Sequence, residues 1–206
     1  MLGGMLVDIQ FSSAHNDWGR VRDAVLQAED EGYDTTWVFD HFDGTVLGGD
    51  RPLLECFTLM GAMAAATTRI GIGALVVNVA NRHPAVMAAA ASTVDRISAG
   101  RLRLGIGAGT GPGTPWAREH HERGIPLQAD MAERHQAVVR QIEALRAATQ
   151  APVVVGVNSI ALATLAGQHA DGVNVRLSSP SAPALLEAAR SAAEHAGGRP
   201  FEASGW

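Results

Sequence analysis

The sequence predicts an α/β fold in which parallel strands form a (β/α) barrel of about seven strands, as a single domain over residues 1–206. Short runs rich in Val, Ile and Leu alternate with longer helical patterns, which is typical of parallel sheets and barrels. Several strand starts lie roughly 30 residues apart, the size of a βαβ repeat. The chain is long enough for one substantial core, and its composition does not indicate a second.

The predicted strands are short apolar runs, and the closing residues FEASGW are interpreted as a seventh strand. The other six runs cover residues 5–11, 35–39, 70–77, 102–107, 152–156 and 171–175.

Three helices between these strands have clear boundaries. The first follows the possible N-cap residues Asn16 and Asp17 and is expected to stop at Gly32. The second begins at Pro84, whose ring suits the first turn of a helix, and ends before a glycine at position 100. The third, over residues 130–147, is the most periodic, and its polar stripe, which includes Arg134, is expected to face water.

The strand spacing alone would also suit a doubly wound sheet. The stretch GIGAGTGPG at 105–113 follows a strand, but it lacks the dinucleotide-binding spacing, because the sixth position counted from each candidate glycine holds Thr or Pro. Pro112 and Pro115 also discourage a helix from starting there. The stretch therefore suits a loop on the rim of a barrel, although its glycine content would equally suit a plain connection between a strand and a helix.

Composition and charge exclude several classes of function. The net charge is −5, so neither a nucleic-acid surface nor a polybasic membrane patch is predicted. The single cysteine, Cys56, cannot form an internal disulfide and is interpreted as a buried thiol. The first residues lack the features of a signal peptide, and no apolar run approaches ~18 residues, so we expect a cytoplasmic protein with no membrane span.

The stretch WVFDHF at 37–42 places an acid and an imidazole at the end of the second predicted strand. Side chains at the carboxyl ends of barrel strands meet at one rim, where active sites are built. Adjacent strand residues point in opposite directions, so Asp40 and His41 are expected to have separate roles rather than to form a dyad. The alternative from the residues alone is that Asp40 is a turn acid and His41 a loop histidine.

Asn158 and Ser159 follow the fifth predicted strand and precede a helix. Ser159 is interpreted as an N-cap, and the free amides of the helix start, with Gly156 permitting close approach, would suit a phosphate. Capping alone would explain the serine equally well. His120 and the histidine after it are interpreted as solvated loop residues, His135 as structural, and no metal site is predicted.

The sequence resembles the luciferase-like monooxygenase superfamily, particularly its branch that uses the deazaflavin coenzyme F420. Four stretches carry the resemblance in the same order along the chain, over most of residues 5–175. They are WVFDHF, LLECFTLMGAMAAATTRIGIGALVV, NRHPAVMAAAASTVDRISAGRLRLGIGAG and PVVVGVNSIALATLAGQHADGVN.

The resemblance implies a TIM-type barrel that holds F420, or alternatively FMN, at the carboxyl ends of its strands, and a hydride transfer to or from a small organic substrate. His41 would be the acid/base group, and Asp40 its polar support or a cofactor contact. The remaining residues implied to bind cofactor are Leu75 and Val76 at a non-proline cis peptide, Gly107, Ala108, Gly109 and Thr110 in a loop beside it, and Gly156, Asn158 and Ser159 at its phosphate.

The chain departs from the family pattern in two places. The usual insertion before PVVVG is absent, and after FEASGW there is no eighth strand, so we expect an incomplete barrel with open edges, which a homodimer would cover. A protein of this kind could be an oxidoreductase, a non-catalytic F420- or flavin-binding protein that retains only the cofactor cradle, or an FMN-dependent monooxygenase.

Overall fold

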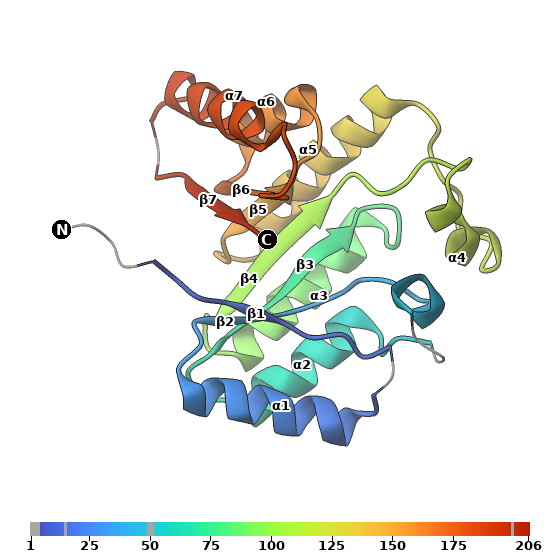
Figure 1. The fold of residues 1–206 in the computed structure, drawn as a ribbon, viewed down its shortest axis with the longest axis vertical. Helices are drawn as coiled ribbons and strands as arrows, with labels where there is room; N and C mark the ends of the chain where they lie inside the picture. The colour runs from blue at the N-terminus through green and yellow to red at the C-terminus, as the bar shows by residue number, and fades with distance from the viewer. Residues whose placement is uncertain (1–4, 15, 49–51, 199) are drawn as a thin grey trace.

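The computed structural model describes residues 5–14, 16–48, 52–198 and 200–206. Seven parallel strands form one sheet in the order β1 to β7, so each strand lies beside the next one in the chain. The sheet curls into a half-barrel, and the helices pack against its outer face (Figure 1). The strands are β1 (Ile9–Gln10), β2 (Thr35–Val38), β3 (Gly71–Asn78), β4 (Leu102–Gly107), β5 (Val153–Gly156), β6 (Gly172–Val175) and β7 (Glu202–Gly205).

Helices connect successive strands, and their ends follow local capping chemistry. The side chain of Asp17 accepts a hydrogen bond from the amide of Arg20 at the start of α1, and Gly32 ends that helix with a φ of 85°. The helices are α1 (Trp18–Glu31), α2 (Cys56–Ala66), α3 (Pro84–Ile97), α4 (Arg118–His121), α5 (Met131–Ala148), α6 (Ile160–His169) and α7 (Ala182–His195), with 3₁₀ turns η1 (Gly44–Leu47) and η2 (Pro115–Ala117).

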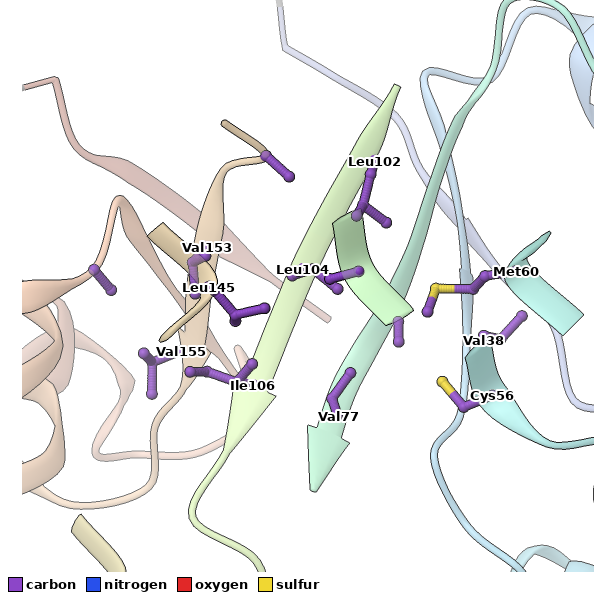
Figure 2. Packing of buried hydrophobic residues seen from close by; sticks show 14 of the residues in the cluster. Val38, Cys56, Met60, Val77, Leu102, Leu104, Ile106, Leu145, Val153 and Val155 are labelled. Atoms are coloured by element: carbon purple, nitrogen blue, oxygen red, sulfur yellow. The ribbon is translucent and has the colours of Figure 1, made fainter. Parts of the chain in front are cut away.

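The hydrophobic core lies between the outer face of the sheet and these helices. Figure 2 shows alternate residues of β4, namely Leu102, Leu104 and Ile106, pointing into the same layer as Met60 of α2 and Leu145 of α5. All five side chains are almost fully buried. Because successive strand residues point to opposite faces, the intervening residues of β4 line the inner face of the half-barrel.

The curl of the sheet brings distant strands together across this inner face. Arg103 of β4 forms an ion pair with Glu202 of β7. In a flat sheet these strands would lie about 14 Å apart, since neighbouring strands are separated by about 4.8 Å. The contact therefore reflects a concave surface, which is the geometry that allows strand ends to converge on one cavity.

The predicted strands are confirmed, including the seventh, but β1 is shorter than expected. Only two residues of the predicted 5–11 run pair with β2, and Met5, Leu6 and Val7 are exposed. β1 has β2 as its only neighbour in the described sheet, and before Ile9 the two segments are joined by hydrogen bonds between Val7 and Asp34 rather than by a regular ladder. Cys56 is a buried free thiol, as predicted. Within the described ranges, no helix combines the length and hydropathy that crossing a bilayer requires.

Candidate active site

A cavity of about 380 Å³ opens at the carboxyl ends of β2, β3, β4 and β5. Most residues predicted from the sequence to form the site lie in its wall. They are Asp40, His41, Val76, Gly107, Ala108, Gly109, Thr110, Gly156 and Asn158. The structure thus brings four strand ends and their loops to one place, as a barrel rim requires.

The other two predicted residues, Leu75 and Ser159, lie beside the cavity rather than in its wall. Leu75 and Val76 are joined by a cis peptide bond, as the resemblance implied, and the carbonyl of Leu75 accepts a hydrogen bond of 2.7 Å from the side chain of Gln10. Ser159 is the N-cap of α6, because its hydroxyl accepts a hydrogen bond from the amide of Leu162. The capping interpretation is therefore confirmed, whereas a role in phosphate binding stays a prediction.

Glycines on the neighbouring strands form the floor of the cavity around the side chain of Val76. A Cβ atom on Gly107 would lie 2.8 Å from Val76 Cγ2, and one on Gly156 would lie 3.0 Å from Val76 Cγ1. Such distances are shorter than normal van der Waals contact. Any larger residue at either position would therefore displace Val76 or fill the floor, and the glycines leave an open apolar surface.

Asp40 is engaged in a buried ion pair. Both carboxylate oxygens accept hydrogen bonds from Arg82 at 2.8 Å, and the amide of Asn78 donates to one of them at 2.9 Å. Burial opposes the charge on Arg82, but its hydrogen bonds to Asp40 and Glu55 outweigh burial and raise the pKa of the guanidinium. Asp40 therefore ties the ends of β2 and β3 to the start of α3, and its charge is already balanced.

His41 has a different acidic partner, so the two residues do not form a dyad, as expected, while their roles stay predictions. Its Nδ1 atom lies 2.7 Å from a carboxylate oxygen of Glu119, a buried residue of α4. The second oxygen of Glu119 accepts hydrogen bonds from the amides of Phe42 at 2.6 Å and Asp43 at 3.1 Å. The ring of His41 is 28% exposed and also lies 5.8 Å from that of Trp116, between ring centroids.

The environment of Glu119 favours its charged form. Burial raises the pKa of this carboxyl group, but the hydrogen bonds from His41 and from the amides of Phe42 and Asp43 outweigh burial and hold the pKa below its ordinary value. A carboxylate at Nδ1 fixes the tautomer and orientation of an imidazole, so Nε2 of His41 is left to exchange a proton with a ligand. Among the described residues, no hydrogen bond involves Nε2.

Sequence reasoning missed Glu119 and misjudged two other residues of the cavity wall, His120 and Arg134. The prediction that His120 is solvated is wrong, because it is 1% exposed and its Nε2 atom lies 2.8 Å from Asn81 Oδ1. Arg134 was expected to face water, yet it lines the cavity. His135, interpreted as structural, is buried in the same wall. The one available signal for Glu119 was its place beside two histidines in REHHERG.

The curled α/β sheet, with a glycine-floored cavity at its strand ends, is the architecture of barrel-type proteins that bind a ligand at the carboxyl ends of their strands. The profile of the luciferase-like monooxygenase family matches residues 4–203, so the chain belongs to that family. Its relatives include an F420-dependent glucose-6-phosphate dehydrogenase of Nakamurella multipartita, 30% identical over 201 residues that cover 86% of this chain and 58% of the relative. Another is a 5,10-methylenetetrahydromethanopterin reductase of Archaeoglobus fulgidus, 36% identical over 85 residues that cover 41% of this chain and 23% of the relative.

Solved structures agree with this fold. An F420-dependent secondary alcohol dehydrogenase in complex with an F420-acetone adduct superposes with a TM-score of 0.78 at 18% identity, over 98% of this chain and 68% of that one. The oxygenating constituent of 3,6-diketocamphane monooxygenase of Pseudomonas putida, in complex with FMN, superposes with a TM-score of 0.68 at 17% identity, over 94% of this chain and 63% of that one. The matched part of the chain thus spans 58% and 23% of the lengths of the two sequence relatives named above.

Proposed function

We propose that this chain is an oxidoreductase that binds coenzyme F420 in the cavity at the ends of β2 to β5 and exchanges a hydride with a small organic substrate. The observation that carries the proposal is the pairing of His41 with buried Glu119, at 2.7 Å, in the wall of a cavity with a glycine floor. The names of sequence relatives and of a solved structure support the choice of F420.

The residues present fit a planar cofactor. A cavity of about 380 Å³ falls within the range of roughly 300–1,000 Å³ that is usual for small-molecule sites. Gly107 and Gly156 leave the floor free of side chains other than Val76, so a flat ring could lie against it. The loop residues Ala108, Gly109 and Thr110 would flank this ring, and Gly156, Asn158 and Ser159 would receive the phosphate. When bound, the deazaflavin would supply the hydride chemistry.

The chain itself would supply proton transfer and orientation. With Nδ1 of His41 held by Glu119, Nε2 can take the hydroxyl proton of a substrate as its carbon–hydrogen bond breaks, or return that proton in the opposite direction. Asp40, bound to Arg82, would act as a support for the strand end that carries His41. Its direct contact with cofactor stays a prediction.

FMN is the second candidate cofactor, because structural neighbours bind it on the same fold. Purified protein should be titrated with F420 and with FMN while absorbance or fluorescence is followed. We expect saturable binding of F420 that is weakened in Gly107→Ala, where the added Cβ would meet Val76. Gly113→Ala is the matched control, because no atom lies within 4 Å of the added Cβ. Tight binding of FMN with no response to F420 would reject the deazaflavin assignment.

Turnover distinguishes an enzyme from a non-catalytic binding protein. Protein loaded with F420 should be tested with secondary alcohols and with glucose 6-phosphate, the substrate types that the names of relatives indicate. Binding of cofactor without any turnover across such a panel would favour the non-catalytic alternative. A homodimer, which would cover the outer edges of β1 and β7, and a cytoplasmic location stay predictions.

A further inference from the structure

We propose that Arg134 and His135 form an anion subsite in the wall of the cavity and that the substrate carries a phosphate or carboxylate group that binds there. Both residues lie near the start of α5 and line the same cavity as His41. The identity of the ligand as a substrate rests on the proposed function, whereas the anion subsite itself does not.

Arg134 has few partners for a residue with five donor groups. One terminal nitrogen donates to the carbonyl of Gly109 at 3.2 Å, and the other lies 2.9 Å from the sulfur of Met131, which is a weak acceptor. Its Nε atom is buried and has no hydrogen-bond partner among the described residues. No carboxylate of the described chain forms an ion pair with this guanidinium, so a buried donor and a full positive charge are left unsatisfied.

The acidic residues of the cavity wall are engaged elsewhere. Asp40 is bound by Arg82 through two hydrogen bonds, and Glu119 is bound by His41 and two backbone amides. Asp130, at the start of α5, uses its side chain to cap the helix at Ala132 and Glu133. Among the described residues that line the cavity, Arg134 is therefore the charged group without an opposite charge, and an anionic ligand would provide it.

His135 adds a second potential donor to the same wall. It is 8% exposed, and no hydrogen bond to its ring nitrogens is present among the described residues. Burial lowers the pKa of His135, and the charge of Arg134 lowers it further, so the neutral imidazole is favoured. The neutral ring keeps one N–H group, which can donate to an anion that binds at Arg134 in the same cavity wall.

The position of the subsite favours a substrate over the cofactor as its ligand. Arg134 contacts Gly109, in the loop after β4 that is predicted to flank the cofactor ring, whereas the segment predicted to receive the cofactor phosphate, Gly156 to Ser159, follows β5. A substrate held by its anionic group at Arg134 would remain in the cavity that His41 lines, so its reacting carbon could face the imidazole.

The test uses inorganic phosphate as the probe, measured by calorimetric titration of the whole chain with and without saturating F420. We expect phosphate to bind in both states and its affinity to fall by about 10- to 100-fold in Arg134→Gln, as for loss of a charge-assisted hydrogen bond. Arg134→Lys retains the charge without the planar fork and should give an intermediate loss. Arg140→Gln is the matched control, because Arg140 is exposed on the same helix.

Three results would overturn the inference. The subsite is absent if phosphate does not bind the unmodified protein, or if Arg134→Gln, with an unchanged melting temperature, binds it equally well. If saturation with F420 abolishes phosphate binding and Arg134→Gln weakens F420 to the same extent, the arginine serves the cofactor phosphate and the substrate assignment is wrong. Binding of phosphate through Arg134 in a chain that never binds F420 would reject the proposed function and leave the anion subsite standing.

Discussion

Two walls of one cavity differ in how their charges are satisfied. On the wall formed by the ends of β2 and β3, Asp40 is bound by Arg82 and His41 by Glu119, all within 2.7–2.8 Å. On the wall at the start of α5, Arg134 has a carbonyl and a thioether as its partners, and its Nε atom has none among the described residues.

The difference indicates that the two walls of the cavity have different roles. Groups that are fully paired before any ligand arrives hold the backbone and fix the orientation of His41, which is the preorganisation that proton transfer requires. Groups that lack partners gain most from a ligand of opposite charge. Substitutions on the paired wall should therefore impair the fold or the rate, whereas substitutions at Arg134 should impair ligand affinity.

The largest effect is expected for His41→Ala in protein loaded with F420. Loss of a positioned general acid/base should lower the turnover rate about 10²- to 10⁴-fold, while F420 affinity changes little. Steady-state kinetics and cofactor titration measure the two quantities. His195→Ala, at an exposed position on α7, should retain normal rates. Unchanged turnover in His41→Ala would show that the paired wall has no part in the chemistry.

A smaller effect, on stability, is expected for Asp40→Ala. The side chain of Arg82 is 12% exposed, so removal of Asp40 leaves a mostly buried charge, and the free energy of unfolding should fall by about 3 kcal/mol. Urea unfolding measures this loss. Glu55→Ala is the control, because this second partner of Arg82 is 42% exposed, and its loss, which also removes the N-cap of α2, should cost about 1 kcal/mol. Equal losses in the two variants would mean that Asp40 is not the structural anchor of this wall.

The smallest effect is expected for Glu119→Gln, and it should depend on pH. Because hydrogen bonds hold the pKa of Glu119 in the folded protein below its ordinary value of 4.5, the carboxylate stabilises the fold above that value. Its contribution should be lost as the pH falls through the lower pKa of the folded state. Unfolding measured from pH 7 to pH 3 should show a difference of about 1–2 kcal/mol between wild type and variant that shrinks with acid. A difference independent of pH would contradict an ionised Glu119 in the folded protein.

Most of the fold could be predicted because strands and helices are encoded locally. Alternation within runs such as LRLGIG and the caps at Asp17 and Gly32 depend on residues close together in the chain, and the structure confirms these elements. β1 is the exception in length. The length of β1 depends on how many of its residues pair with β2, which a run of apolar residues does not reveal.

The candidate site could be predicted only in part, because its partners are distant in sequence. His41 and Gly107 could be predicted because each lies at the end of a predicted strand. Glu119 lies 78 residues from His41, and only the course of the loop after β4 brings the two together. Helical periodicity assigned Arg134 to the polar stripe of α5. That stripe faces water over most of the helix, whereas near its start the side chain meets the cavity.

A crystal structure of the chain with F420 bound is the most direct test of a deazaflavin site at the strand ends. We predict that the ring lies over Val76, Gly107 and Gly156 with its reacting edge toward His41. A cofactor bound at another surface, such as the groove between α6 and α7, or a ring on the far side of the cavity from His41, would contradict this prediction.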